Sequence, residues 1–180
     1  LVEVFDRHGV SFVSVTQQFN TTTSMGRLTL NVLLSFAQFE REVTGERIRD
    51  KIAASKRKGL WMGGVPPVGY LAKGRTLEPE EPHASRVREI YDLYLKLNCV
   101  RLVAAELKAR RWLTPERENK RKGFGGNRAF SRGHLHRILG NPIYAGMVGH
   151  KGENFPGMHP AIVEMDLWTQ VQQRLEANRQ

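Results

Sequence analysis

Residues 23–58 read TSMGRLTLNVLLSFAQFEREVTGERIRDKIAASKRK, and this stretch predicts one long helix around which the rest of the chain is organised. No proline interrupts it, and Thr23 or Ser24 can cap its start. In its first half, large apolar residues recur at spacings of three and four, as on a buried helical face. These residues are Met25, Leu28, Val32, Phe36, Phe39 and Val43, with a second apolar set at Leu30, Leu33, Leu34 and Ala37. We therefore expect this half to be buried between its own domain and a partner.

The second half of this helix has a different character. From Thr44 to Lys58 the sequence holds six Lys or Arg against two Asp or Glu, and only Ile48 and Ile52 are large and apolar. At about 1.5 Å per residue the whole helix would extend roughly 50 Å, which is longer than a small domain needs. One interpretation is an amphipathic helix with a solvated, charged end. The other is a dimerisation helix whose basic end lies on DNA.

The composition favours a polyanionic partner. The 180-residue chain carries a formal net charge of +10 and has a pI of about 10.2. No stretch is long and apolar enough to span a bilayer, so nucleic acid is a better candidate than a membrane. The single cysteine, Cys99, excludes an internal disulfide framework and a cysteine-rich zinc site, and no metal or cofactor is predicted. Without a visible signal peptide, the expected compartment is the cytoplasm.

The remaining sequence predicts short helices and strands. The order helix, loop, strand before residue 23 suggests the end of an α/β domain, and five glycines with two prolines between Gly59 and Gly74 mark a boundary. Helices are predicted over 1–7, 84–97, 100–111, 132–139 and 164–180, strands over 10–15, 70–71, 144–150 and 161–163, a loop over 114–130 and a turn over 152–158. The pair 84–97 and 100–111 resembles the start of a helix-turn-helix. The predicted fold is mainly α with small β elements (α+β), ending in a winged-helix-like module.

Charge is densest between Lys108 and Arg137, where ten of thirty residues are Lys or Arg and two are Glu. Such residues can neutralise phosphates and release counterions. The predicted helix over 132–139 could also enter a major groove and reach base edges. The candidate DNA-binding residues here are Arg121, Lys122, Arg128, Arg132, His134, His136 and Arg137. The alternative is a solvated basic loop that contacts no nucleic acid.

Two other motifs carry less weight. The pair His134 and His136 has no carboxylate or cysteine at a useful spacing for a metal. The spacing of His134 and Arg137 matches a box of tyrosine recombinases, but the last tyrosine, Tyr144, follows only seven residues later, so that family is rejected. Taken by itself, the sequence predicts a dimeric DNA-binding protein without a complete active site.

Several linked segments resemble the large serine recombinases, the phage-type integrases of the resolvase/invertase superfamily. The end of that family's catalytic domain is resembled by FVSVTQ (12–17), TTSMGRL (22–28), FAQFERE (36–42) and ERIRDK (46–51). Its recombinase domain is resembled by GGVPPVGY (63–70), ILGNPIYAG (138–146) and HPAIV (159–163). One departure is Gly45, where the family commonly has Ser, and this glycine is expected to soften the helix at a cost of up to about 1 kcal/mol relative to alanine.

The resemblance implies an activity and its residues. Members cut DNA with a serine hydroxyl that attacks a phosphodiester, and arginines offset the phosphate charge in the transition state. The nucleophile is expected to precede Leu1, so the chain is interpreted as a fragment that binds DNA without cutting it. Arg41 and Arg47 resemble the residues nearest the scissile phosphate. The alternative is that they form only surface ion pairs with Glu40 and Glu46.

The resemblance also divides the chain. Residues 1–58 are expected to be the C-terminal part of the catalytic domain, 59–74 a linker, and 75–180 the recombinase DNA-binding domain. Subunits are expected to pair into dimers and tetramers through Met25, Leu28, Val32, Phe36 and Phe39. Contacts to double-stranded DNA across the cleavage site are expected from Arg47, Arg49, Lys51, Lys56, Arg57 and Lys58. With most of the catalytic core outside the chain, the apolar half of the helix is expected to be exposed and to self-associate, through Leu30, Leu33 and Leu34.

The predicted function is therefore the DNA-binding portion of a site-specific serine recombinase. The full-length protein would cut and rejoin DNA at an attachment site through a phosphoserine intermediate. The alternative is a non-enzymatic, dimeric winged-helix regulator. A weaker alternative is a structural chromosome-binding protein, which would bind DNA without sequence preference.

Overall fold

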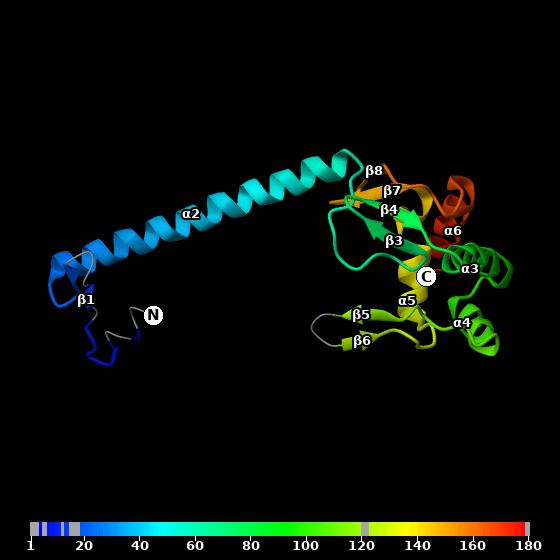
Figure 1. Cartoon of the computed structure of the whole chain (residues 1–180), viewed down its shortest axis with the longest axis horizontal. Helices are drawn as coiled ribbons and strands as arrows, with labels where there is room; N and C mark the ends of the chain where they lie inside the picture. The colour runs from blue at the N-terminus through cyan, green and yellow to red at the C-terminus, as the bar shows by residue number, and fades with distance from the viewer. Residues whose placement is uncertain (1–3, 5–6, 12, 15–18, 120–122, 179–180) are drawn as a thin grey trace. The chain divides into compact units, whose positions relative to one another are not determined.

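The structure, a computed structural model, describes residues 4, 7–11, 13–14, 19–119 and 123–178 (Figure 1). It divides into two compact units, Leu1–Lys51 and Ile52–Gln180. Most of the predicted helix over 1–7 and part of the predicted strand over 10–15 lie outside the described residues. The predicted division into a catalytic part (1–58), a linker (59–74) and a recombinase domain (75–180) stays a prediction.

A single long helix dominates the first unit. Strand β1 (Val13–Ser14) pairs antiparallel with β2 (Phe19–Asn20), and α2 (Ser24–Arg57) follows, 34 residues long. The hydroxyl oxygen of Thr23 accepts a hydrogen bond from the Gly26 amide at 3.0 Å, so Thr23 caps the helix start as predicted. The helix runs without interruption across the boundary between the units, and the prediction of one long helix is confirmed.

The apolar half of α2 is exposed. Gly26 is the one buried residue of the helix, whereas Met25 is 72 % exposed, Phe36 64 % and Phe39 61 %. The burial expected within its own domain is therefore not observed, because the described part of the first unit offers little besides β1 and β2 to cover a helix of this length. The other expectation, that the apolar half of α2 is exposed in this chain, is confirmed.

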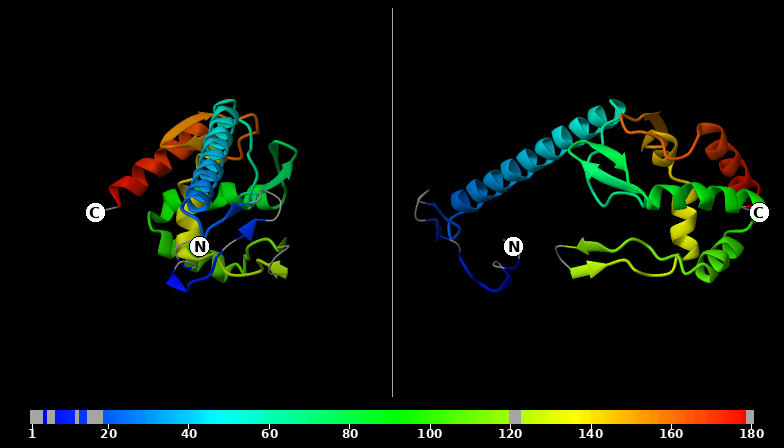
Figure 2. Two further views of the ribbon diagram at one scale, coloured as in Figure 1. Left: turned by 90° about the vertical axis from the view of Figure 1, so that its left-hand side faces the viewer. Right: turned by 45° about the vertical axis from the view of Figure 1, so that its right-hand side comes forward.

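The second unit alternates hairpins with helices (Figures 1 and 2). In chain order its elements are β3 (Tyr70–Lys73), β4 (Thr76–Pro79), α3 (His83–Leu97), α4 (Val100–Ala109), β5 (Arg117–Asn119), β6 (Gly123–Gly125), α5 (Arg132–Leu139), the 3-10 helix η1 (Pro142–Ala145), β7 (Met147–His150), β8 (Glu153–Pro156) and α6 (Met165–Ala177). The described strands form three separate two-stranded antiparallel sheets in this unit, β3 with β4, β5 with β6 and β7 with β8. The mainly α fold with small β elements is confirmed.

Three local predictions were wrong, and the predicted strand over 144–150 was right only for Met147–His150, because Tyr144 and Ala145 belong to η1. The predicted loop over 114–130 contains the hairpin β5–β6, and the predicted turn over 152–158 contains β8. The predicted strand over 161–163 is absent from the described structure at those residues, because the amides of Ile162 and Val163 both donate to the carbonyl oxygen of Tyr144, at 3.0 and 2.9 Å. This hydrogen bonding ties the segment to η1 instead of to a strand.

Helix α3 lies at the centre of the core and fixes α5. Its residues Ile90 and Tyr91 are fully buried, as are Leu135 and Leu139 of α5. The Tyr91 hydroxyl donates to the carbonyl oxygens of Ile138, at 2.8 Å, and Leu139, at 3.2 Å. These bonds satisfy the last turn of α5, where carbonyl groups lack partners within the helix. The position of α5 is therefore set by both packing and hydrogen bonding.

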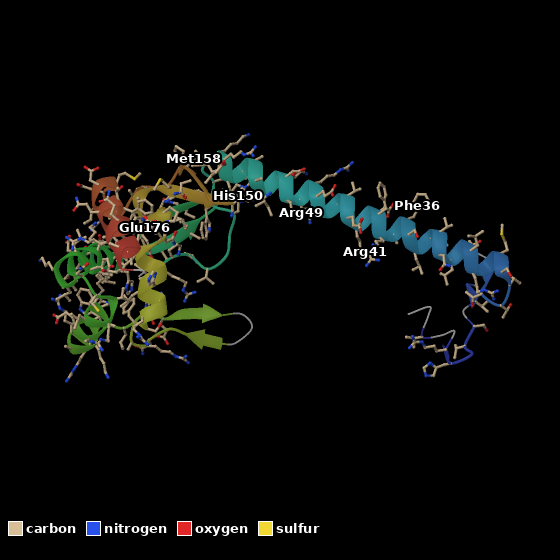
Figure 3. The ribbon with its side chains drawn as sticks, turned by 180° about the vertical axis from the view of Figure 1, so that it is seen from behind. Phe36, Arg41, Arg49, His150, Met158 and Glu176 are labelled. Atoms are coloured by element: carbon tan, nitrogen blue, oxygen red, sulfur yellow. The ribbon has the colours of Figure 1, made fainter. Side chains whose placement is uncertain are left out.

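Gly59 joins the end of α2 to strand β8. Its carbonyl oxygen accepts a hydrogen bond from the Met158 amide at 2.9 Å, and its φ is +73°. A Cβ atom added at Gly59 would lie 2.2 Å from the carbonyl oxygen of Pro156. Figure 3 labels Met158 and His150 beside this end of the helix. Only glycine fits this junction without a shift of the backbone.

We expect Gly59→Ala to lower the free energy of unfolding of the second unit by at least about 2 kcal/mol, since it combines positive-φ strain with a backbone clash. Chemical denaturation followed by circular dichroism measures this. Gly133→Ala is the matched control, because a Cβ there meets nothing within 4 Å, and it should stabilise by up to about 1 kcal/mol. Equal stability of Gly59→Ala and the parent protein would contradict the prediction.

Candidate nucleic-acid interface

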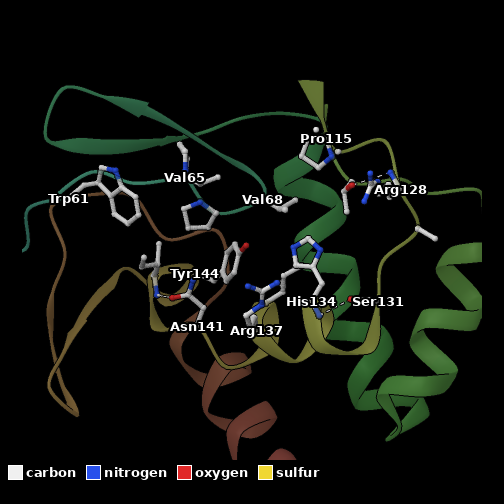
Figure 4. Close-up of a pocket in the computed structure, with 18 residues that line it drawn as sticks. Trp61, Val65, Val68, Pro115, Arg128, Ser131, His134, Arg137, Asn141 and Tyr144 are labelled. Atoms are coloured by element: carbon white, nitrogen blue, oxygen red, sulfur yellow. Dashed lines mark hydrogen bonds between the residues drawn. The ribbon is translucent and has the colours of Figure 1, made fainter. Parts of the chain in front are cut away.

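A groove with about 1100 Å³ of open space runs through the second unit (Figure 4). Three segments line it: the chain after α2, the base of hairpin β5–β6, and α5 with η1. Figure 4 shows His134 and Arg137 rising from α5 toward the segment that carries Trp61 and Val65. The described lining residues include Arg128 and Arg137 and no Asp or Glu. The groove therefore offers cationic and apolar surface without an opposing carboxylate.

Helix α5 presents one of its faces to the groove. Leu135 and Leu139 point into the core, and the buried Ile138 also borders the groove. Ser131, His134 and Arg137 line the groove from the exposed side of the helix. Arg132 and His136 are exposed and lie outside the groove lining. The four α5 residues predicted to contact DNA are thus divided between two faces, because residues three apart share a helix face and residues two apart do not.

Local contacts fix His134 at the start of α5. The Ser131 hydroxyl oxygen accepts a hydrogen bond from the His134 amide at 3.2 Å and caps the helix. The His134 ring stacks on Phe130 with a centroid distance of 5.4 Å and an interplanar angle of 26°. The predicted cap and helix bounds are confirmed, and the imidazole is held against an aromatic ring at the groove wall.

The base of hairpin β5–β6 places Arg128. The Thr114 amide donates to the Arg128 carbonyl oxygen at 2.9 Å, and the Arg128 amide donates to the Thr114 hydroxyl oxygen at 3.2 Å. Thr114 itself lines the groove. The predicted DNA-binding residues Arg121 and Lys122 lie outside the described residues.

The groove arginines have no carboxylate partner among the described residues. Salt bridges in the described part of the second unit are Lys73–Glu78, Arg88–Glu81 and the pairs of Arg110 with Glu89 and Glu106. Among the described residues, neither Arg128 nor Arg137 pairs with a carboxylate. Since a cation already paired with a carboxylate gains less from a phosphate, these two arginines are the stronger anion ligands.

The basic residues of α2, and Lys58 directly after it, are also accessible. Arg47, Arg49, Lys51, Arg57 and Lys58 are exposed, and Lys56 is half-buried. The ion pairs of Arg41 and Arg47 with Glu40 and Glu46, the alternative weighed above, do not occur in the described structure. Instead, the Arg41 Nε donates to the Ala37 carbonyl oxygen at 3.2 Å.

His150, on β7, lies near the end of α2 and had no signal in the sequence. Burial lowers the pKa of His150, and the positive charges of Lys56, Lys151 and Arg57 lower it further. The ring is therefore neutral at neutral pH and adds no charge there. Thr114 and Trp61 are two further groove residues that sequence reasoning missed, since neither belongs to a charged or periodic pattern.

The described residues hold no group of three or more His, Cys, Asp or Glu that could bind a metal. Among the helices of the described chain, none combines the length and the apolar character that crossing a bilayer requires.

Residues 81–178 match the Recombinase family, and residues 1–61 match the family described as Resolvase, N terminal domain. The first match covers more than half of the chain. The chain belongs to the Recombinase family. This confirms the resemblance to large serine recombinases. The segment that matches the resolvase family comes first in the chain, and the segment that matches the Recombinase family follows it.

Curated relatives match the chain over part of their length. It is 33 % identical over 92 residues to the Transposon Tn917 resolvase of Enterococcus faecalis, which covers 51 % of this chain and 50 % of the resolvase. It is 35 % identical over 99 residues to the serine recombinase gin of Escherichia phage Mu, covering 53 % of this chain and 50 % of gin. The recombinase-family chain thus spans about half the length of these curated relatives.

Two solved structures share the fold. One is described as the crystal structure of an LSR–DNA complex, with a TM-score of 0.60, 19 % identity, and coverage of 73 % of this chain and 38 % of that chain. The other comes from work on sequence requirements of the Listeria innocua prophage attP site, with a TM-score of 0.61, 19 % identity, and coverage of 72 % and 51 %. At this identity the likeness concerns the fold.

Proposed function

We propose that this chain is the DNA-binding part of a site-specific serine recombinase. The observation that carries the proposal is the groove in the Recombinase-family unit, which contains Arg128 and Arg137 and no carboxylate among its described lining residues. A duplex presents closely spaced phosphates, and such a surface gains affinity by releasing their counterions. The fold shared with a protein in an LSR–DNA complex supports the same partner.

The two ends of the chain would contact DNA in different ways. In the second unit, Arg137 and His134 would approach base edges or phosphates from α5, and Arg128 would bind phosphate from the hairpin base. Along α2 and at Lys58 directly after it, basic residues would follow the DNA backbone across the cleavage site. These are Arg47, Arg49, Lys51, Lys56, Arg57 and Lys58. The predicted contacts of Arg132, Arg121 and Lys122 stay part of this proposal.

In the full-length protein, a serine hydroxyl would attack a phosphodiester, form a phosphoserine bond and release a 3′-hydroxyl. The bond energy is conserved, so no ATP is required. Arg41 and Arg47 would offset phosphate charge near that step. Dimers and tetramers would form through the exposed apolar stripe of α2, in the cytoplasm of a bacterial or phage-infected cell. We expect the 180-residue chain itself to bind DNA.

The non-enzymatic regulator has weaker support, because both matched families are recombinase or resolvase families. A structural chromosome-binding protein differs in one measurable way, namely equal affinity for any DNA sequence.

The test is a salt series of binding to a random-sequence duplex and to duplexes from the DNA that flanks the parent gene. Between about 50 and 200 mM salt, we expect the logarithm of affinity to fall with log salt with a slope of about −5 or steeper. We also expect tighter binding to one flanking duplex. A slope near zero would contradict the nucleic-acid interface, and equal affinity for all duplexes would contradict site specificity.

A further inference from the structure

Helix α4 presents apolar residues to the solvent. It packs against α3 and α5, and its residues Val103 and Leu107 are fully buried. A helix at the surface of a domain ordinarily carries charged and polar residues opposite its buried face. At about 100° per residue, that position in α4 is occupied by Leu102, Ala105 and Ala109. All three are exposed, Leu102 by 46 %.

These three residues have the spacing of a coiled-coil seam. They recur at intervals of three and then four residues, which is how one helix packs its side chains along another. A single exposed leucine needs no explanation, but here two alanines continue the line of Leu102 along the helix. Because Ala105 and Ala109 project little from the backbone, a second helix could approach α4 to about 8 Å between the helix axes. We call Leu102, Ala105 and Ala109 the α4 seam.

The two sides of the α4 seam differ in charge. On one side lie Arg101 and Lys108, both exposed and without a carboxylate partner among the described residues. On the other side lies Glu106, whose carboxylate accepts a hydrogen bond from the Arg110 Nε at 2.7 Å. One side is therefore an uncompensated basic edge, and the other is neutralised within the chain.

These charges disfavour a second copy of the same chain as the occupant of the seam. In an antiparallel helix pair related by two-fold symmetry, the same side of each helix meets across the seam. Arg101 and Lys108 would then face their own counterparts, and like charges in contact lower the affinity. A parallel pair would bring this side to Glu106, whose carboxylate already binds Arg110. DNA is also a poor fit, because the middle of the face is apolar and no seam residue lines the groove.

We propose that the outer face of α4 is a docking surface for an acidic amphipathic helix of a partner protein. The apolar stripe of that helix would cover the α4 seam, and its carboxylates would lie beside Arg101 and Lys108. Charges that flank an apolar seam determine which helices pair and in which orientation. The docking surface does not depend on the proposed function, since none of its residues belongs to the DNA contacts proposed above.

The test is the binding of a fluorescent peptide to the full 180-residue chain, measured by anisotropy. The peptide is about 21 residues long, so that it can form a helix, with leucine and alanine at the seam positions and glutamate at the flanking positions. We expect saturable binding to the parent chain. Leu102→Ala should raise the dissociation constant about tenfold. Arg101→Glu/Lys108→Glu should lose the acidic peptide and instead bind a matched peptide with lysine at the flanking positions, which the parent chain should not bind.

Lys96→Glu/Arg174→Glu is the matched control, because it reverses two exposed charges outside the α4 seam and should leave peptide binding nearly unchanged. The proposal is overturned if the parent chain does not bind the acidic peptide, or if the control variant loses it equally. Loss of the peptide in Arg128→Ala/Arg137→Ala would place it in the groove and overturn the proposal as well. If Leu102→Ala weakens binding of a random-sequence duplex, the face binds DNA, and if it alters self-association in sedimentation, the face binds a second copy. Either result overturns the proposal.

Discussion

Replacing Arg128 and Arg137 together by alanine should weaken DNA binding by about two orders of magnitude. Both side chains are exposed, line the same groove, and pair with no carboxylate among the described residues. A hydrogen bond to a charged group contributes about 1.5–3 kcal/mol, so the loss of two such contacts corresponds to about a hundredfold or more in the dissociation constant. The slope of log affinity against log salt should become shallower by about two.

The matched control removes the same charge from outside the groove. Lys96 is exposed on α3, and Arg101 is exposed on α4. The double variant Lys96→Ala/Arg101→Ala therefore lowers the net charge equally but leaves the groove intact. Titrations of both variants with a random-sequence duplex would separate a local contact from a general charge effect. Equal weakening by the two variants would contradict the groove as the interface.

The helices that carry these residues could be predicted because their signals are local. Helix α5 begins after Ser131, which caps it, and ends before Gly140, as the sequence indicates. The same holds for α2, where an uninterrupted pattern and the capping Thr23 determine the start. In both cases the deciding interactions join residues within four positions of one another.

The hairpin β5–β6 could not be predicted in this way. Its sequence is polar and basic, with few of the β-branched or aromatic residues that strands favour. It forms because Thr114 and Arg128, fourteen positions apart, hydrogen-bond through their backbones, and because Leu113 bridges Ala129. Pairing over that separation leaves no periodic pattern in either segment.

The composition of the groove shows the same limit. Arg132 and Arg137 are equivalent in charge and belong to one helix, yet only Arg137 lines the groove. A helical wheel separates them, but it does not tell which face is occupied by the core. Burial of Leu135, Ile138 and Leu139 against α3 decides this, and that packing depends on residues about fifty positions earlier in the chain.

We expect the chain to self-associate through α2, and replacing Phe36 and Phe39 together by glutamate should make it a monomer. The two rings are 64 % and 61 % exposed and belong to an apolar stripe that extends along α2. Continuous apolar surface of this kind indicates an interface. Burial of one such side chain contributes about 1.5–3 kcal/mol, so the double substitution should raise the dimer dissociation constant at least about a hundredfold. Sedimentation velocity over a concentration series measures it.

Two further variants make the result specific. Leu71→Glu/Leu102→Glu adds the same charges at exposed apolar residues of the second unit, 53 % and 46 % exposed, and should leave self-association unchanged. Leu33→Glu/Leu34→Glu alters the second apolar set of α2 instead. If only that variant dissociates the protein, pairing occurs through the other face and the assignment to Phe36 and Phe39 is wrong. If Phe36→Glu/Phe39→Glu alone dissociates it, DNA affinity should fall as well, because a dimer binds two half-sites with one association step.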